Sequence, residues 1–297
     1  MKTNKPFITT LFFVVVSGFL IFAITGNNKD RVMHEGTAMF FPESIDFAGE
    51  NAPLNITDVK ERLDRELLIN ANLDATTALI IKRANRVFPI IEPILKQYNV
   101  PDDFKYLAVI ESGLTNAVSG SGAKGVWQFM PDSAKEKGME VNDIVDERYH
   151  LEKSTIAACK YLLVAKDKFG SWTLAAAAYN GGMTGISKKI EEQKVTDYYD
   201  LALTEETSRY VFRILALKEI MKNPEKYGFS IFSSDLYVPI PTKKVEVDST
   251  IIDLAEFAFS QGINYKILKI HNPWLRDKKL LNPTKKKYEI QIPLSGF

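Results

Sequence analysis

The stretch from Pro101 to Pro131 constrains the fold most, because it joins one apolar helix face, a carboxylate and a flexible loop. Proline at a first helical position, followed by Asp102 and Asp103, predicts that a helix begins here. Spacing by i, i+3, i+4 and i+7 then forms one stripe, which consists of Phe104, Leu107, Ala108 and Glu111. The stripe predicts that Glu111 faces the protein interior at the end of its helix.

Two interpretations of Glu111 follow from this pattern. A carboxylate at the end of an apolar face, beside a loop rich in glycine and serine, is typical of an acid whose pKa is raised by burial. Alternatively, the side chain turns to solvent at the helix end, as most glutamates do. The helix alone does not distinguish the two, so the decision depends on the rest of the chain.

Helical patterns fill most of residues 58–228 and predict a mainly α domain. Pro89 and Pro93 are expected to end or kink the second of these patterns. The expected segments are Asp58–Leu68, Thr76–Tyr98, Asp132–Lys137, Leu151–Phe169, the alanine-rich Ser171–Tyr179, and Glu205–Met221. The sequence Asn180-Gly181-Gly182 is expected to stop the alanine-rich helix.

The pattern changes after Tyr237. Two alternating segments enclose two short helical ones and predict a small α+β module with the order β-α-α-β. These segments are Lys244–Val247, Ile251–Ser260, Gly262–Ile270 and Tyr288–Ile292. The expected fold is therefore a mainly α domain followed by a small α+β module.

Charge and composition exclude several function classes. With 38 basic and 37 acidic residues the net charge is +1, which argues against a nucleic-acid partner. The single cysteine, Cys159, cannot form an intramolecular disulfide, and His34, His150 and His271 lack metal-ligand spacing. We therefore expect no metal and no cofactor, which leaves carboxylates as the groups that carry chemistry.

The N-terminus carries an uncharged apolar run, Phe7–Ile24, after two lysines. The run is close to the roughly 20 residues that span a bilayer, and its positive flank predicts a cytoplasmic N-terminus with an exported remainder. We interpret residues 1–26 as a signal anchor, with a cleaved signal peptide as the alternative, because the cleavage pattern is weak. Residues 27–85 are expected to form a linker, up to about residue 55, and an N-terminal helical extension.

Three sequence blocks stand in one order along the helical region. They are Glu111-Ser112 with Gly125-Val-Trp-Gln-Phe-Met-Pro131, then Ala177-Ala-Tyr-Asn-Gly-Gly182, then Glu206-Thr-Ser-Arg-Tyr-Val211. Together they resemble the lysozyme-like catalytic domain of soluble lytic transglycosylases, which is related to goose-type lysozyme. With the upstream Pro101-x-x-Phe-x-Tyr-Leu and the C-terminal module, the chain is similar to the membrane-bound lytic transglycosylase D type. The expected bounds are 86–230 for the lysozyme-like domain and 236–297 for the module.

The C-terminal module resembles a divergent LysM domain, a fold that binds glycans. The resemblance rests on Ile263-Asn-Tyr-x-x-Leu-x-x-x-Asn272-Pro273 and on the closing Tyr288-x-Ile-x-Ile-Pro293. In place of a Gly-Asp-Thr opening, the chain has Val247-Asp-Ser-Thr250. Glycan binding and a purely structural role both remain open for this LysM-like module.

The resemblance implies a reaction and a set of site residues. The reaction cleaves the β-1,4 bond between N-acetylmuramic acid and N-acetylglucosamine in peptidoglycan without water, leaving a 1,6-anhydro end. Glu111 would be the acid and then the base, a role that requires a raised pKa. The residues implied to contact or orient the substrate are Ser119, Gln128, Met130, Tyr179, Asn180, Glu206 and Tyr210. The loop that carries Ser119 is one residue shorter than the common pattern.

Specific contacts are expected for three side chains. The phenol of Tyr179 would point at the carboxylate of Glu111 or at a substrate acetamido group, and the alternative is that Tyr179 only packs. Glu206 would be a buried structural or orienting carboxylate that is hydrogen-bonded near Glu111, and the alternative is an ordinary surface charge on a helix. Trp127, where many relatives have methionine, is either a core residue or a platform for a sugar ring.

We therefore predict an exported, membrane-anchored lytic transglycosylase at the periplasmic face of the membrane, whose partner is the peptidoglycan glycan strand. The first alternative is a peptidoglycan hydrolase on the same fold. The second is an inactive protein that binds the cell wall. The sequence leaves the oligomeric state open.

Overall fold

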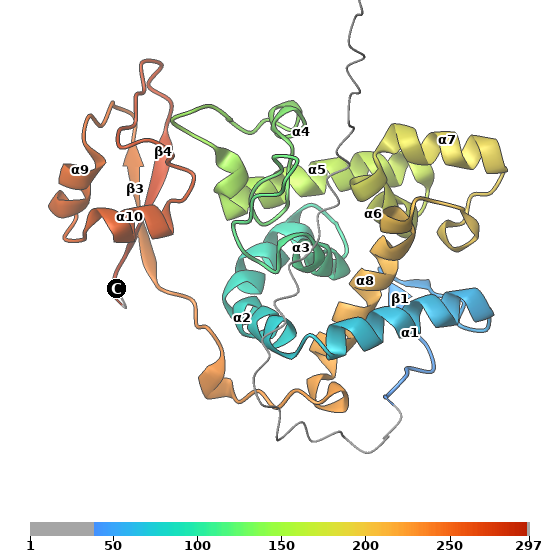
Figure 1. Cartoon of the computed structure of the whole chain (residues 1–297). Helices are drawn as coiled ribbons and strands as arrows, with labels where there is room; N and C mark the ends of the chain where they lie inside the picture. Colours follow the sequence, from blue (N-terminus) through green and yellow to red (C-terminus); the bar gives the residue numbers. More distant parts are fainter. Residues whose placement is uncertain (1–38, 296–297) are drawn as a thin grey trace, which may run out of the picture. The chain divides into compact units, whose positions relative to one another are not determined.

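The computed structural model describes residues 39–295, which contain ten α-helices and four short strands (Figure 1). The predicted signal anchor, Phe7–Ile24, lies outside the described residues. Within residues 39–295, every helix is too short or too polar to span a bilayer.

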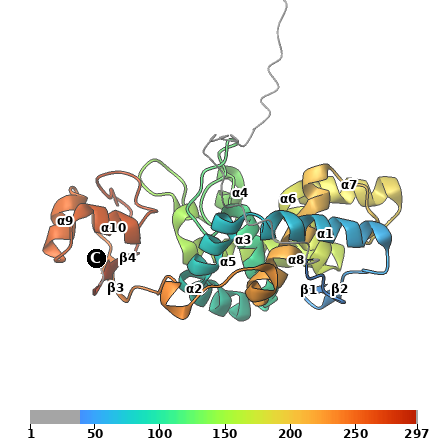
Figure 2. The same cartoon turned by 60° about the horizontal axis from the view of Figure 1, so that its bottom comes forward.

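Eight helices form the helical part of the chain, and α8 lies at its centre. α8 packs against α1, α3 and α6, while α5 packs against α2 and α6 (Figure 1, Figure 2). The eight are α1 (Thr57–Ala71), α2 (Asp74–Gln97), α3 (Lys105–Ser112), α4 (Pro131–Glu136), α5 (Leu151–Phe169), α6 (Trp172–Gly181), α7 (Met183–Gln193) and α8 (Glu205–Lys222). Phe212, Ile214 and Leu215 of α8 are fully buried in one continuous apolar cluster. Each such side chain stabilises the fold by about 1.5–3 kcal/mol.

Small side chains allow α6 to sit between its neighbours. Its four consecutive alanines, Ala175–Ala178, are completely buried, so the backbones of α5 and α8 can approach closely. α6 ends at Gly181 as the sequence predicts, but another helix, α7, begins at Met183. The sequence analysis did not predict α7, whose start lies directly after the two glycines.

α2 corrects the prediction for the proline-containing segment. The helix runs unbroken from Asp74 to Gln97 with Pro89 and Pro93 inside it. Both prolines are exposed, whereas Ile91 and Leu95 on the opposite side are buried. Prolines four positions apart share one helix face. The two missing N–H groups therefore lie on the solvent side, where water can hydrogen-bond the carbonyls that they leave without a partner. Packing of the buried side keeps the helix continuous.

The segment that was expected to be a linker up to residue 55 is partly folded. Strands β1 (Asp46–Phe47) and β2 (Glu50–Asn51) form a small antiparallel hairpin. Phe47 is fully buried and meets Phe104 edge to face, with ring centroids 4.9 Å apart. The Glu50 carboxylate accepts hydrogen bonds from the backbone N–H groups of Trp172 (2.6 Å) and Thr173 (2.8 Å). The hairpin therefore caps the N-terminus of α6.

The LysM-like module has the predicted order of elements. Strands β3 (Thr242–Val247) and β4 (Tyr288–Pro293) pair antiparallel, and between them lie α9 (Leu254–Ser260) and α10 (Tyr265–His271). Its apolar cluster includes Leu254, Leu268 and Ile290, and also Val145 from the segment before α5. The fold class, mainly α with a small β-α-α-β module, is confirmed.

Candidate active site

Glu111 lies in the last turn of α3, and the helix ends immediately after it. Gly113 adopts a left-handed conformation (φ 57°), and its N–H bonds the Val109 carbonyl, so the chain turns sharply away. Phe104, Leu107 and Ala108 of the predicted stripe are completely buried. The sequence therefore predicted correctly that Glu111 shares a helix face with core residues.

The Glu111 carboxyl meets a phenol from α8. The hydroxyl of Tyr210 donates a hydrogen bond to Glu111 Oε1, and Tyr210 itself is buried. Burial raises the pKa of Glu111 from 4.5 to about 7. The hydrogen bond from Tyr210 and the charge of Arg213 lower it, whereas the charge of Glu206 raises it. Desolvation outweighs the stabilising contacts, so the carboxyl can both donate and accept a proton near neutral pH.

Arg213 is a site neighbour that the sequence analysis missed. Its Nη2 donates to the backbone carbonyl of Ile110 at 3.1 Å, one residue before Glu111. It lies one helical turn after Tyr210 on α8, so the two side chains share a face toward α3. That spacing was visible in the sequence, but nothing in it showed that this face meets the end of α3.

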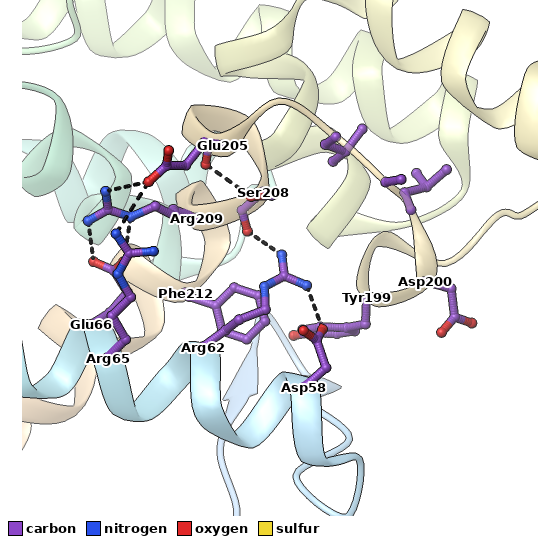
Figure 3. A pocket seen from close by; sticks show the side chains of 13 residues that line it. Asp58, Arg62, Arg65, Glu66, Tyr199, Asp200, Glu205, Ser208, Arg209 and Phe212 are labelled. Carbon is purple, nitrogen blue, oxygen red and sulfur yellow. Dashed lines mark hydrogen bonds and ion pairs between the residues drawn. The ribbon is translucent and has the colours of Figure 1, made fainter.

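An ion pair between α8 and α1 fixes the orientation of α8 next to Tyr210. Arg209 Nε donates to the Glu66 carboxylate of α1 at 2.7 Å, and Glu66 is completely buried. This pair lies in a pocket of about 460 Å³ between α1, the start of α8 and the turn Tyr198–Asp200 (Figure 3). Because Arg209 is clamped to α1, the next residue, Tyr210, is held toward α3.

The pocket in Figure 3 is distinct from the Glu111 site. Each of its three arginines contacts a carboxylate: Arg62 with Asp58 (3.1 Å), Arg65 with Glu205 (3.3 Å) and Arg209 with Glu66 (2.7 Å). The guanidinium of Arg62 also lies over the ring of Phe212, 4.4 Å from its centroid. The pairs of Arg65 and Arg209 join α1 to α8, whereas Arg62 and Asp58 both belong to α1. The pocket contains none of the predicted substrate residues.

The loop 117–130 carries Ser119 and Gln128 and is shaped by its own hydrogen bonds. Ser119 Oγ accepts from the N–H of Ala123 at 2.9 Å. The side-chain amide of Gln128 donates to the carbonyls of Ala117 (3.0 Å) and Gly125 (2.7 Å), and its backbone is left-handed (φ 49°). Gln128 therefore shapes the loop with its nitrogen, and its Oε1 is the atom left to contact a ligand.

Trp127 and Met130 face opposite environments. Trp127 is 0% exposed, and its Nε1 donates to Thr155 Oγ1 at 2.9 Å. It is therefore a core residue and not a sugar platform, which settles the two interpretations. Met130, at the start of α4, is 42% exposed and is available to a ligand.

The structure contradicts the predicted contact between Tyr179 and Glu111 and the predicted burial of Glu206. Tyr179 donates its hydroxyl to the backbone carbonyl of Trp127 at 2.7 Å and not to Glu111, so it anchors the loop from behind. Glu206 is exposed and not buried. Its Oε1 accepts from Asn180 Nδ2 at 2.9 Å, and Asn180 Oδ1 accepts from the Thr207 hydroxyl at 2.7 Å. Asn180 thus ties the end of α6 to the start of α8.

Ser112 connects α3 to the same loop. Its hydroxyl donates to the carbonyl of Val126 at 2.8 Å. The structure therefore brings Glu111, Tyr210, Tyr179 and the loop 117–130 into one connected arrangement. Among residues 39–295, no three His, Cys, Asp or Glu side chains gather in a group that could hold a metal ion.

Comparison with known proteins gives two domain matches. Residues 88–201 match the family described as "Transglycosylase SLT domain", and residues 243–296 match "Soluble lytic transglycosylase C-terminal LysM-like domain". The chain is 31% identical over 263 residues to "Membrane-bound lytic murein transglycosylase D" of Escherichia coli strain K12, covering 85% of this chain and 57% of that protein. The protein of the same name in Escherichia coli O6:H1 gives the same values. The chain thus spans a little over half the length of these curated relatives.

Proposed function

Because the chain carries a transglycosylase SLT domain followed by a LysM-like C-terminal domain, we propose that it is a lytic transglycosylase that cleaves peptidoglycan glycan strands. The curated relatives it resembles are named as membrane-bound lytic murein transglycosylases. The catalytic domain is proposed to comprise residues 86–230, and the LysM-like module residues 236–297.

The Glu111 carboxyl is the observation that supports this proposal most directly. Its pKa is raised to about 7, and Tyr210 orients it through a hydrogen bond. An acid of this kind is protonated in a large fraction of molecules at neutral pH and can give up and recover a proton within one turnover. A surface glutamate does neither, because it is ionised at this pH.

We assign the chemical steps as follows. Glu111 donates its proton to the glycosidic oxygen as the bond to C1 of N-acetylmuramic acid breaks. The acetamido group of the same sugar supports the positive charge at C1, in place of the second carboxylate of ordinary glycosidases. Glu111 then accepts the proton of the C6 hydroxyl, whose oxygen bonds to C1 and forms the 1,6-anhydro ring. No water is consumed, and the carboxyl returns to its protonated form.

The neighbouring residues have supporting roles in this proposal. Tyr210 orients the Glu111 carboxyl. The sugars are contacted by the free Oε1 of Gln128, the hydroxyl of Ser119 and the exposed Met130. Asn180 and Glu206 lie on the other side of the proposed substrate site. Tyr179 contributes by holding the loop through the Trp127 carbonyl. The proposed partner is the glycan strand, and the proposed location is the cell envelope, with residues 7–24 as the membrane anchor.

The products of the reaction test the proposal. The full chain and its Glu111→Gln variant are incubated with purified sacculi, and the released muropeptides are analysed by mass spectrometry. We expect 1,6-anhydro ends from the wild type and none from the variant, while both proteins bind sacculi equally.

Three outcomes would contradict the proposal. Reducing ends, each heavier by one water, would show a hydrolase on the same fold. Equal wall degradation by wild type and Glu111→Gln would remove Glu111 from the reaction. If the wild type releases nothing but binds sacculi, the protein is a wall-binding protein.

A further inference from the structure

The loop 117–130 is held from behind by one buried arginine. Nη1 of Arg148 donates to the carbonyls of Gly122 (3.1 Å) and Phe129 (3.2 Å), which lie on the two arms of the loop. The side chain of Arg148 is only 3% exposed. A single guanidinium therefore bridges the two arms and sets the distance between them.

Arg148 is in turn fixed by Asp146. Its Nε and Nη2 donate to the two carboxylate oxygens of Asp146 at 2.9 and 2.7 Å, a bidentate pair in a buried setting. The loop also lies directly on the Arg148 backbone, because a Cβ added to Gly125 would come within 1.9 Å of the Arg148 carbonyl oxygen. The segment around Asp146 and Arg148 is thus the support on which the loop rests.

The LysM-like module attaches to this same segment through its backbone. The N–H of Asp146 donates to the carbonyl of Trp274 at 2.9 Å, and the N–H of Arg276 donates to the carbonyl of Ile144 at 2.7 Å. Between these bonds, Val145 pairs with Leu275 and enters the apolar cluster of the module. Asp146, which pairs with Arg148, is therefore also hydrogen-bonded to the module.

Side chains extend the attachment on both flanks. Lys286 Nζ contacts Glu140 (2.6 Å) and Glu147 (3.3 Å), and the hydroxyl of Tyr288 donates to Glu140 at 2.9 Å. The guanidinium of Arg276 lies over the ring of Tyr149, 4.3 Å from its centroid. The module thus contacts the chain before, within and after the Asp146–Arg148 pair.

From these contacts we propose that the LysM-like module is a positioning element for the loop 117–130, which it supports through Asp146 and Arg148. Three residues of the module that contact the catalytic domain, Trp274, Arg276 and Lys286, lie in the segment 272–287 between α10 and β4. The role in catalysis rests on the proposed function, since only a glycan-cleaving enzyme needs Ser119 and Gln128 in place. The mechanical coupling does not rest on it.

A double variant on the module's side of the contact tests the coupling and leaves Asp146 and Arg148 in place. Replacing Arg148 directly would leave Asp146 buried without its partner, which destabilises folded proteins strongly. The double substitution Lys286→Ala with Tyr288→Phe instead removes three contacts to Glu140 and Glu147 and keeps the aromatic ring. Lys287→Ala is the matched control, because this neighbouring lysine pairs with Glu246 inside the module at 2.9 Å.

Hydrogen exchange of the full chain, without substrate, is the first measurement. The reporters are loop amides bonded within the loop, such as Ser119 to Ala123 and Lys124 to Phe129. We expect their exchange to accelerate about tenfold in the double variant and not in Lys287→Ala. Amides of α9 and α10 should be unchanged, which would show that the module remains folded. Unchanged loop exchange in the double variant would overturn the proposal.

Turnover of a short soluble glycan is the second measurement. We expect the double variant to lose several-fold in kcat with sacculus binding unchanged. A loss of sacculus binding with unchanged kcat would instead make the module a wall anchor and would overturn the positioning role. If no protein, including the wild type, turns over the glycan, the proposed function fails, whereas the exchange result still decides the coupling.

Discussion

Tyr210 on α8 donates its hydroxyl hydrogen to Glu111 at the end of α3, although 99 positions separate them in the sequence. The bond links the central helix of the fold to the candidate acid. The packing of α8 against α1, fixed by Arg209 and Glu66, therefore also sets the position of the phenol relative to the carboxyl. The environment that raises the pKa of Glu111 is a product of core packing.

Tyr210→Phe should change both the rate and its pH dependence. Burial raises the pKa of Glu111 to about 7 against the lowering effect of this hydrogen bond. Removing the bond should raise the pKa further, so the alkaline decline of kcat/KM moves to higher pH. We expect kcat to fall at least about tenfold, because the carboxyl loses its orientation.

The control for this variant is Tyr199→Phe. The buried hydroxyl of Tyr199 has no hydrogen-bond partner among the described residues, so its removal should leave the pH profile unchanged. A shift of the Tyr210→Phe profile to lower pH would contradict the prediction, because it would mean that water hydrates the carboxylate in place of the phenol.

Parts of this arrangement could be predicted from sequence, and the reasons are local. The 3.6-residue period defined α5 to its final bounds, Leu151–Phe169, and it placed Glu111 on a core-facing stripe. The prediction that Pro89 and Pro93 end or kink a helix did not consider which helix face they occupy. Both lie on the exposed face of α2, where proline is tolerated.

The contacts between helices could not be predicted in the same way. A period shows that a helix has an apolar face but not which helix that face meets. The resemblance implied a buried Glu206, although this residue is exposed. Periodicity also did not show that Glu66 of α1 is buried against α8. The roles of Arg148 and Arg213 depend on carbonyl groups, which every residue carries and no side-chain motif reveals.

Gly125→Ala should destabilise the protein and disorder the loop. The new Cβ would lie 1.9 Å from the Arg148 carbonyl oxygen, at a backbone φ of +84°. Backbone cannot yield as a flexible side chain does, so we expect a loss of roughly 3 kcal/mol or more in the free energy of unfolding.

Gly122→Ala is the matched control, since its φ is +89° with nothing within 4 Å of the added Cβ. It should cost only about 1–2 kcal/mol, the strain of the left-handed conformation. Denaturant unfolding measures both. Equal losses would mean that the close approach to Arg148 does not constrain the loop.

Glu50→Gln should weaken the cap of α6. Burial alone would raise the pKa of Glu50, but hydrogen bonds from the backbone of Trp172 and Thr173 outweigh it and hold the pKa below 4.5. The carboxylate therefore stabilises the fold above that pH, and the contribution disappears as the pH falls through its lowered value. We expect a loss of about 1–2 kcal/mol at pH 7. Glu43→Gln, an exposed glutamate of the same segment, should cost nothing measurable, and equal losses would refute the cap.

Glu111→Gln should increase stability, and only at alkaline pH. The folded-state pKa of Glu111 is raised to about 7 from 4.5, so the folded chain holds this proton more tightly than the unfolded chain. The protonated carboxyl therefore makes its full contribution to the free energy of unfolding below pH 4.5, and this contribution is lost as the pH rises through 7. Above that pH the buried carboxylate costs roughly 3 kcal/mol, a cost that glutamine avoids. Thermal unfolding should therefore show a midpoint several degrees above wild type at about pH 8.5, and similar midpoints at about pH 5.

Glu191→Gln, an exposed position on α7, should show no such pH dependence. If Glu111→Gln lowers the midpoint equally at both pH values, the carboxyl is a structural hydrogen-bond acceptor for Tyr210, and its raised pKa cannot be the basis of acid catalysis.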